Sequence, residues 1–445
     1  MKTVAQLRTS AREIWEAALS AASPSACLHR AIKVTNRILS VNGKDIPLSG
    51  RVIVVGAGKA AARMAQVTEE IFGDSISNGL VVTKHDHGLP LHRIRLVEAG
   101  HPIPDLTGVQ AVHDMREILS NLSANDIVIC LISGGGSALW PSPADGITLA
   151  EKQEVTHMLL RAGATIQELN GVRKHLSSVK GGQLARWAAP ARVISLIMSD
   201  VIGDPLDFIA SGPTAPDTTS FDEALATIEK YNVNPPRAVM HRLREGAAGR
   251  IPENPKPEDP LFQRVDNLII ANNRLLVDAA NAKAREHGFQ TLILGTELEG
   301  EAREVARMFS AVAKEIASSG NPIKPPACVL AAGETTVAVR GDGLGGRNQE
   351  MALAWAIAMS GRAVSAPCCF ASVASDGTDG PTTAAGGLVD PETCRRAAEL
   401  GLKPQEFLQQ NNSFEFLDAT GDLIVTGPTQ TNLMDLQILL VGQKP

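Results

Sequence analysis

The sequence has few aromatic residues, no cysteines at CxxC spacing and no long apolar run. Only 3% of its residues are aromatic, with one tyrosine among them, so we expect a planar ligand to lie between aliphatic side chains. The six cysteines include no CxxC pair, which argues against a zinc site and a disulfide framework and suits a reducing cytoplasm. No apolar run approaches the roughly 18 residues of a membrane span. A membrane protein and a disulfide-stabilised secreted domain are therefore excluded.

Long basic runs are missing as well. The net charge is −6, and no stretch of lysine and arginine provides the positive face that a nucleic-acid backbone requires. The N-terminus lacks the apolar core of a signal peptide, and residues 4–18 repeat apolar side chains at helical spacing. We therefore expect a soluble cytoplasmic protein that binds neither nucleic acid nor membrane and holds anionic ligands in local clusters.

What is present is the composition of a large globular protein. The 445 residues are 44% hydrophobic and 20% charged, enough for two cores, because one domain typically holds about 100–200 residues. Prolines interrupt residues 251–260, where they remove backbone donors and disfavour helix. We therefore predict a linker at residues 246–260 between domains at residues 4–245 and 263–440.

Short runs rich in valine and isoleucine alternate with helical patterns, as in a parallel α/β sheet with crossover helices. The predicted strands are residues 52–55, 79–83, 126–132, 193–198, 268–271, 291–294, 328–332, 368–374 and 423–425. The predicted helices include one after the capping box at Thr148 and two at residues 302–317 and 348–359. Open parallel sheets bind ligands at the carboxyl ends of their strands, and the polar clusters of this sequence fall at such ends.

The first cluster follows the strand at residues 52–55. Gly56 and Gly58 allow backbone N–H groups to approach an oxyanion, and Lys59 adds a positive charge. Gly56, Gly58 and Ala61 also fit a degenerate dinucleotide fingerprint, for which Asp86 is a weak candidate for the ribose-binding acid. A plain strand-to-helix turn is the third interpretation. The residues alone leave phosphate or substrate binding, dinucleotide binding and a turn open.

The second cluster follows the most hydrophobic strand. It consists of Ser133, Gly134, Gly135, Gly136 and Ser137. Three glycines between two serines present several N–H groups and hydroxyls to a polyphosphate. A flexible loop is the alternative, but a buried strand seldom ends in three glycines unless something approaches closely. We therefore predict a phosphate-binding loop.

Charged residues mark two further segments of the first half. Asp200 and Asp204 follow the strand at residues 193–198, where carboxylates bind Mg²⁺ directly or through its waters, or else cap a turn. Arg173 and Lys180 lie in a stretch rich in basic residues and glycine. They either clamp a carboxylate or phosphate or belong to a solvated loop.

The second half has similar clusters. Gly333, Glu334 and Thr335 end a predicted strand, and a glycine-rich segment precedes Arg347 at the start of a helix. Anionic ligands are favoured at helix starts, so Arg347 is a candidate transition-state clamp unless the glycines only form a flexible loop. Asp376 follows another strand and could meet a metal, a ribose or a sugar-acid hydroxyl, or only form a turn.

Seven segments in this order resemble the glycerate 2-kinase family, whose C-terminal part is the MOFRL domain and some of whose members are labelled hydroxypyruvate reductase. They are residues 56–60, 133–139, 199–204, 211–214, 333–336, 345–350 and 375–380. The likeness covers nearly the whole chain, and seven matches in one order are far more specific than any single loop.

The resemblance implies a Rossmann-like N-terminal domain with a mostly parallel sheet, a smaller α/β MOFRL-type C-terminal domain and a cleft between them. It also implies that ATP and Mg²⁺ serve the transfer of the γ-phosphate to D-glycerate, giving 2-phospho-D-glycerate. Lys59 and Arg347 would be the catalytic residues, because phosphoryl transfer depends on positioning and charge stabilisation. The partners would be the small molecules glycerate and ATP, and we allow for a homodimer.

Each remaining candidate then receives an expected ligand. We expect nucleotide or phosphate at Ser133, Gly134, Gly135, Gly136, Ser137, Gly333, Glu334 and Thr335, substrate at Gly56, Gly58, Arg173, Lys180 and Asn348, and metal at Asp200, Asp204 and Asp376.

Two rival functions stay open. An NAD(P)H-dependent hydroxypyruvate reductase would need an acid near the carbonyl, for which His85, His101 or His175 could be proposed, although none has a convincing cofactor context. A non-catalytic sensor of sugar acids or nucleotides would keep the glycine loops, but it would not need a lysine, an arginine and several carboxylates.

Overall fold

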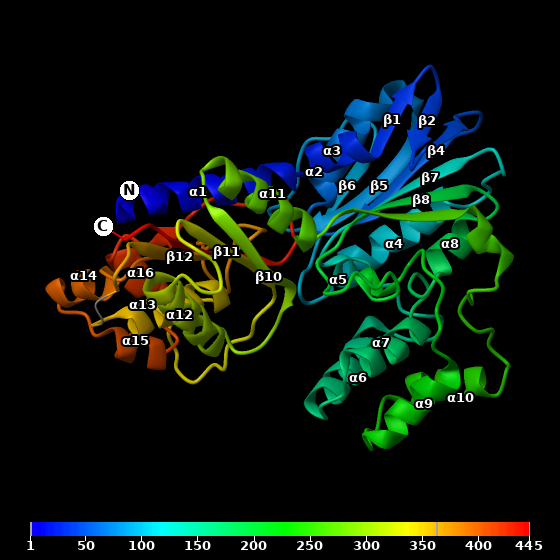
Figure 1. The fold of residues 1–445 in the computed structure, drawn as a ribbon. Coiled ribbons are helices and arrows are strands. Elements are labelled where there is room, and N and C mark those ends of the chain that lie inside the picture. The colour runs from blue at the N-terminus through cyan, green and yellow to red at the C-terminus, as the bar shows by residue number, and fades with distance from the viewer. Residues whose placement is uncertain (1, 362–363, 445) are drawn as a thin grey trace. The chain divides into compact units, whose positions relative to one another are not determined.

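The computed structural model describes residues 2–361 and 364–444, and the chain divides into two compact units (Figure 1). We call Cys27–Ile270 the parallel-sheet unit, and Met1–Ala26 together with Ala271–Pro445 the mixed-sheet unit. Each unit has a six-stranded sheet of its own. The α/β fold expected from the alternating pattern is confirmed.

The division differs from the domain bounds expected at residues 4–245 and 263–440. Helix α1 (Val4–Ala21) packs on α11 (Asn273–Glu286) of the mixed-sheet unit. Strand β9 (Val265–Ala271) is an edge strand of the parallel sheet. The proline-rich segment expected to be a linker is bound to the parallel-sheet unit, since Asn254 donates to Asp217 at 2.8 Å and accepts from Gln183 at 2.8 Å.

The parallel sheet has the strand order β6-β5-β4-β7-β8-β9. Its other strands are β4 (Val52–Ala57), β5 (Ile76–Lys84), β6 (Arg95–Ala99), β7 (Ile127–Ile132) and β8 (Arg192–Met198). The pairs from β6 to β8 are all parallel. Strands β4 and β7 are buried at every position, as expected of apolar strands covered on both faces.

Helices and a small hairpin sheet complete this unit. The elements near the sheet are α2 (Pro24–Ala31), α3 (Ala61–Phe72), α4 (Leu106–Ile118), α5 (Gly136–Leu139), α8 (Gln183–Ala188), the short helices η1 (Gly73–Ser75), η2 (Ile209–Ser211) and η3 (Pro260–Arg264), and the antiparallel strands β1 (Ile32–Thr35), β2 (Ile38–Val41) and β3 (Lys44–Pro47). The short β hairpins were not predicted from the sequence.

Four helices of the same unit form a separate cluster beside the sheet (Figure 1). They are α6 (Leu149–Arg161), α7 (Ile166–His175), α9 (Phe221–Lys230) and α10 (Arg237–Ala247). Capping boxes at Thr148, Thr165 and Ser220 start three of them. Their apolar faces share a core that includes Leu159 and Phe221.

The second sheet is mostly antiparallel, with the order β10-β11-β15-β12-β13-β14 and one parallel pair, β10 with β11. Its strands are β10 (Gln290–Leu298), β11 (Ala327–Gly333), β12 (Cys368–Ala374), β13 (Gly386–Val389), β14 (Leu423–Ile424) and β15 (Asp435–Val441). Its helices besides α1 and α11 are α12 (Ala302–Ser319), α13 (Arg347–Met359), α14 (Thr393–Glu399), α15 (Pro404–Gln409) and α16 (Ser413–Ala419). The C-terminal strand β15 was not predicted, and it lies between β11 and β12.

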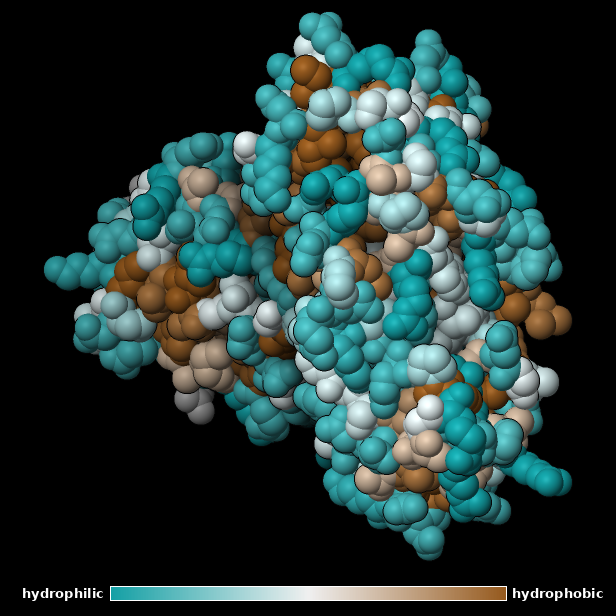
Figure 2. Space-filling view, turned by 90° about the vertical axis from the view of Figure 1, so that its right-hand side faces the viewer, coloured by the Kyte–Doolittle hydropathy of each residue, from teal (hydrophilic) through white to brown (hydrophobic). Residues whose placement is uncertain are grey.

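Hydrophilic side chains cover most of the face in Figure 2, and hydrophobic side chains show in smaller patches between them. Within the described residues, no helix combines the length and the hydropathy needed to cross a bilayer. All six cysteines are described, and each is a buried free thiol.

Candidate active site

The two glycine loops predicted from the sequence are hydrogen-bonded to each other. Strands β4 and β7 are parallel neighbours, so their carboxyl ends lie at the same edge of the sheet. The backbone N–H of Lys59 donates to the carbonyl of Gly134 at 2.8 Å. The N–H of Ala60 donates to the hydroxyl of Ser133 at 3.0 Å. The loops therefore form one structural unit, and the Ser133 hydroxyl is engaged within it.

Glycine is required where these loops meet. A Cβ on Gly58 would lie 2.0 Å from Ser133 Oγ, and the φ of Gly58 is +144°. A Cβ on Gly135 would lie 2.9 Å from the ring of His101 and 3.5 Å from Cγ of Lys59. Cγ of Lys59 thus lies beside Gly135 of the loop at residues 133–137, and the kinase hypothesis requires these two segments to be neighbours.

Ser137 joins this loop to the predicted basic cluster. Its hydroxyl accepts hydrogen bonds at 2.7 Å from both Arg173 and Lys180, and it lies 3.0 Å from the hydroxyl of Ser211. Lys180 also donates to the Ser137 carbonyl at 2.7 Å. Arg173 is on α7 and Lys180 follows it, so the helical cluster supplies cations to the edge of the sheet. The solvated-loop interpretation is wrong for Lys180, which is 1% exposed, and Arg173 is half-buried on α7.

Lys152 is a third cation of this region, and the sequence analysis did not single it out. It lies on α6, is 7% exposed, and its ammonium has no hydrogen-bond partner among the described residues. Burial, followed by the charges of Arg173 and Arg242, lowers the pKa of Lys152 well below its usual value. Burial, followed by the charges of Arg173 and Lys152, does the same to the pKa of Lys180.

The candidate metal ligands fall in both units. Asp200 and Asp204 follow β8 and are half-buried, and the N–H of Asp204 donates to the Val201 carbonyl in a turn. Asp376, in the mixed-sheet unit, accepts from the N–H of Thr378 at 3.0 Å. Asp200 and Asp204 supply the hard oxygen donors that Mg²⁺ prefers. Their role as ligands stays a prediction.

A group of possible metal-binding side chains does occur on α4. Among the described residues, His113, Asp114 and Glu117 bring their ligand atoms together there, and two of the three are exposed. Asp114 is already paired with Arg95. None of the predicted metal ligands belongs to this group.

In the mixed-sheet unit, two carboxylates fix the guanidinium of Arg347. Asp435 accepts from Nε at 2.5 Å and from Nη2 at 3.0 Å, and Glu334 accepts from Nη1 at 2.7 Å. Burial alone would lower the pKa of Arg347, but hydrogen bonding and charge from Asp435, with the charge of Glu334, raise it above its usual value. Arg347 is therefore held charged and in one orientation.

Asp435 was missed by the sequence analysis. It is the first residue of β15, where antiparallel pairing places it beside Gly333 of β11 and Ala374 of β12. The amino end of β15 thus meets the carboxyl ends of its two neighbours. An aspartate at the beginning of an apolar strand was the available signal.

Asp379 binds the amino end of α13 next to Arg347. Its carboxylate accepts from the N–H of Asn348 at 3.2 Å and of Gln349 at 2.8 Å. Burial, followed by the charge of Asp435, raises the pKa of Asp379 to about 6, although these N–H groups lower it. The side chain of Asn348 is 0% exposed, donates to Asp379 and accepts from Ser372. It stabilises the helix start, and its contact with substrate stays a prediction.

The remaining nucleotide candidates of this unit lie at the end of β11. The N–H of Glu334 donates to the Leu298 carbonyl at 2.9 Å, and its carboxylate binds Arg347. Gly333 is packed so closely that a Cβ would lie 2.2 Å from the Leu298 carbonyl oxygen. The hydroxyl of Thr335 is buried without a hydrogen-bond partner among the described residues. Gly56, by contrast, is a buried strand residue of β4 in the other unit.

The dinucleotide interpretation has little geometric support. The space beside Gly58, which a pyrophosphate would need, is taken by Ser133. Asp86 lies in a turn after β5 with a φ of 63°. His175, one of the proposed acids of a reductase, is 0% exposed and is bound to Gly171 and Glu253.

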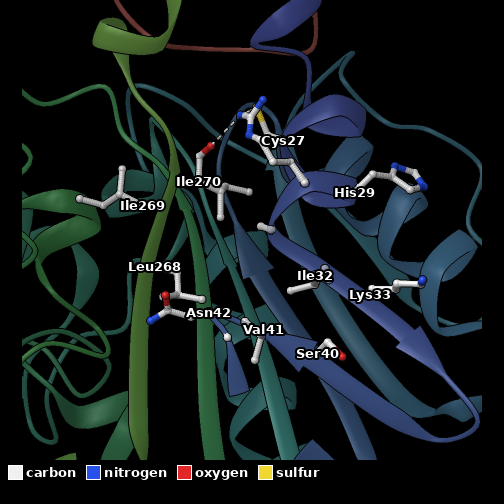
Figure 3. Close-up of a pocket in the computed structure, with 13 residues that line it drawn as sticks. Cys27, His29, Ile32, Lys33, Ser40, Val41, Asn42, Leu268, Ile269 and Ile270 are labelled. Atoms are coloured by element: carbon white, nitrogen blue, oxygen red, sulfur yellow. Dashed lines mark hydrogen bonds between the residues drawn. The ribbon is translucent and has the colours of Figure 1, made fainter. Parts of the chain in front are cut away.

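Another cavity of the parallel-sheet unit is lined by none of these residues (Figure 3). It has a volume of about 600 Å³ and is lined by the first hairpin and by β9. In Figure 3 Cys27 and Ile270 lie at one end of it, where Arg30 donates to the Ile270 carbonyl at 3.4 Å. None of the predicted site residues lines it, so it does not define the active site.

A parallel sheet with glycine loops and buried cations at its carboxyl edge is typical of anion-binding α/β proteins. Residues 10–244 match the family described as "Domain of unknown function (DUF4147)", and residues 327–435 match the MOFRL family. D-glycerate 2-kinase of Thermotoga maritima is 41% identical, with 98% of each chain covered. The chain belongs to the glycerate 2-kinase family.

A solved structure and a differently named relative complete the comparison. The crystal structure of glycerate kinase from Thermotoga maritima has a TM-score of 0.87 and 40% identity, and the match covers 98% of this chain and 99% of that one. A relative from Agrobacterium vitis, 40% identical over 97% of this chain and 94% of its own, is provisionally named a hydroxypyruvate reductase. The expected family and two-domain α/β fold are confirmed.

Proposed function

We propose that this protein transfers the γ-phosphate of ATP to the 2-hydroxyl of D-glycerate, giving 2-phospho-D-glycerate. The observation that carries the proposal is that Lys59 lies beside Gly135, while Ser137 of the same loop accepts hydrogen bonds from Arg173 and Lys180. Cations around a glycine loop suit a polyphosphate. The names of the relatives supply the acceptor.

Lys59 and Arg347 are the proposed catalytic residues. A phosphoryl group in transfer spreads negative charge over its oxygens, so fixed cations stabilise the transition state more than the ground state. The carboxylates of Glu334 and Asp435 hold Arg347 in place before the reaction. Asp200 and Asp204 would hold Mg²⁺, which supplies positive charge to the triphosphate.

We place the reaction in the cytoplasm. Six buried thiols suit a reducing compartment, and the proposed partners are small molecules. We still allow for a homodimer.

A reductase is the second candidate, because a close relative carries that name. Two incubations of purified protein separate the functions. The first contains D-glycerate, ATP and Mg²⁺, with a blank lacking glycerate, and the second contains hydroxypyruvate and NADH. We expect glycerate-dependent ADP formation and no loss of NADH. Loss of NADH without ADP formation would establish the reductase instead.

A further inference from the structure

A pocket of about 430 Å³ lies within the helical cluster of the parallel-sheet unit. Helices α6 and α7 provide its walls, and residues 102–104 close one side. Three exposed hydrophobic side chains line it, namely Ile103 at 71%, Leu160 at 54% and Ile166 at 53% exposure. Large apolar side chains that converge on one hollow mark a ligand or partner site.

The same pocket is lined by Lys152, Arg173 and Lys180. Among the described residues, no carboxylate forms an ion pair with any of the three. Ser137 binds two of these cations and also lines the pocket, whereas the ammonium of Lys152 lacks a hydrogen-bond partner in the described chain. Burying Lys152 and Lys180 beside Arg173 without an acid destabilises the fold unless a polyanion binds there. The pocket therefore combines an apolar wall with a cationic end beside the glycine loop.

We propose that this pocket binds the adenine nucleotide, with the nucleoside against Ile103, Leu160 and Ile166 and the phosphates on Lys152, Arg173 and Lys180. The inference rests on the proposed function, and it assigns to Lys152 a role in binding the phosphate donor.

A nucleotide fits these observations better than glycerate does. Glycerate is a small and fully polar acid that gains nothing from an apolar wall. An adenine ring buries apolar area, and this wall is aliphatic, as expected for a chain with few aromatic residues. Three cations also match the charge of a diphosphate or triphosphate better than that of one carboxylate.

The test is calorimetric titration of the full chain with ADP, inorganic tripolyphosphate and D-glycerate as separate probes. Lys152→Met keeps the length of the side chain and removes its charge. We expect it to weaken ADP and tripolyphosphate binding by about tenfold or more, with D-glycerate binding unchanged. Lys230→Met is the control, because Lys230 is an exposed residue of α9 paired with Glu168, and its affinities should equal those of the wild type.

A second variant tests the apolar wall without touching a buried residue. Leu160→Ser combined with Ile166→Ser should weaken ADP binding by about fivefold, while tripolyphosphate binding stays within about twofold of the wild type. The unfolding temperature of Lys152→Met should not fall, because the substitution removes a buried amine that has no hydrogen-bond partner among the described residues. If Lys152 had a purely structural role, the unfolding temperature of Lys152→Met would fall.

Three outcomes would overturn the proposal. They are wild-type protein that does not bind ADP, ADP affinity unchanged in both variants, and a Lys152→Met variant that loses D-glycerate binding but keeps ADP binding. The titration needs no turnover. If the wild type makes no ADP from glycerate and ATP, the proposed function fails, but the titration still decides what the pocket binds.

Discussion

At the scale of single residues, Arg347 and Asp435 depend on each other. The carboxylate of Asp435 is 0% exposed, and Arg347 is the cation that it binds. Removing the arginine therefore leaves a buried carboxylate without its counter-ion, which costs about 3–5 kcal/mol in typical proteins. A plain Arg347→Ala substitution would lower stability as well as turnover, so it cannot isolate catalysis.

A pair of variants separates the two effects. We expect Arg347→Met to lower both the unfolding temperature and kcat, the latter by about 10²-fold or more. Adding Asp435→Asn should restore most of the unfolding temperature, since the buried charge is then gone, but kcat should stay low. Calorimetry measures the unfolding temperatures of both proteins, and steady-state kinetics measure their kcat values. Recovery of kcat in the double variant would show that Arg347 has only a structural role.

Asp379 gives a prediction about pH. Its pKa is about 6 in the folded protein against 3.8 for an ordinary aspartate, as in the unfolded chain, so the folded state binds more protons between these pH values. Stability from this group is present at low pH and is lost as pH rises from about 4 to 6. In denaturant titrations, the free energy of unfolding of Asp379→Asn should therefore rise relative to that of the wild type between about pH 4 and 6, and the difference should stay constant above that range. If the difference in free energy of unfolding between the two proteins did not change with pH, the raised pKa of Asp379 would be wrong.

At the scale of elements, the interlocked loops after β4 and β7 depend on glycine. A Cβ on Gly58 would overlap Ser133 Oγ, and the positive φ adds backbone strain. We expect Gly58→Ala to lower the free energy of unfolding by about 2 kcal/mol or more and to reduce kcat, because Lys59 would shift with the loop. Denaturant unfolding and kinetics measure both effects.

The matched control is Gly171→Ala on α7, where a Cβ would make only ordinary contacts at 3.8 Å and beyond. Alanine favours a helix interior by up to about 1 kcal/mol over glycine, so this variant should be as stable as the wild type or more so. Equal losses in both variants would show that the loops tolerate a side chain at Gly58.

Some strands could be predicted from the sequence, and others could not. Buried runs such as β7 and β12 are continuous and apolar, so their positions followed from local pattern. Strand β6 was not predicted, because Arg95 and Glu98 interrupt its apolar pattern. Strand β15 is apolar, but its antiparallel position between β11 and β12 depends on distant segments.

The residues of the candidate site also divide into those that the sequence singled out and those that it did not. The glycine loops and Lys59 were identified from residue types that have few other uses at strand ends. Lys152 was not, because a lysine on an amphipathic helix normally faces water, and its burial results from the packing of α6 against α7. The importance of Asp435 likewise depends on a strand pairing that no local pattern predicts.

At the scale of the whole molecule, the central claim is phosphoryl transfer to a particular hydroxyl of glycerate. The site geometry shows cations beside a glycine loop, phosphate binding there is our proposal, and the choice of the 2-hydroxyl comes from the names of the relatives. The product itself therefore tests the account best.

The decisive measurement is the proton-coupled ³¹P spectrum of the product formed from D-glycerate, ATP and Mg²⁺ by the wild-type protein. A phosphate on the 2-hydroxyl couples to the single methine proton and gives a doublet, which is the result we predict. A triplet, from coupling to the methylene protons of a 3-phosphate, or the absence of any new phosphate ester, would contradict the account.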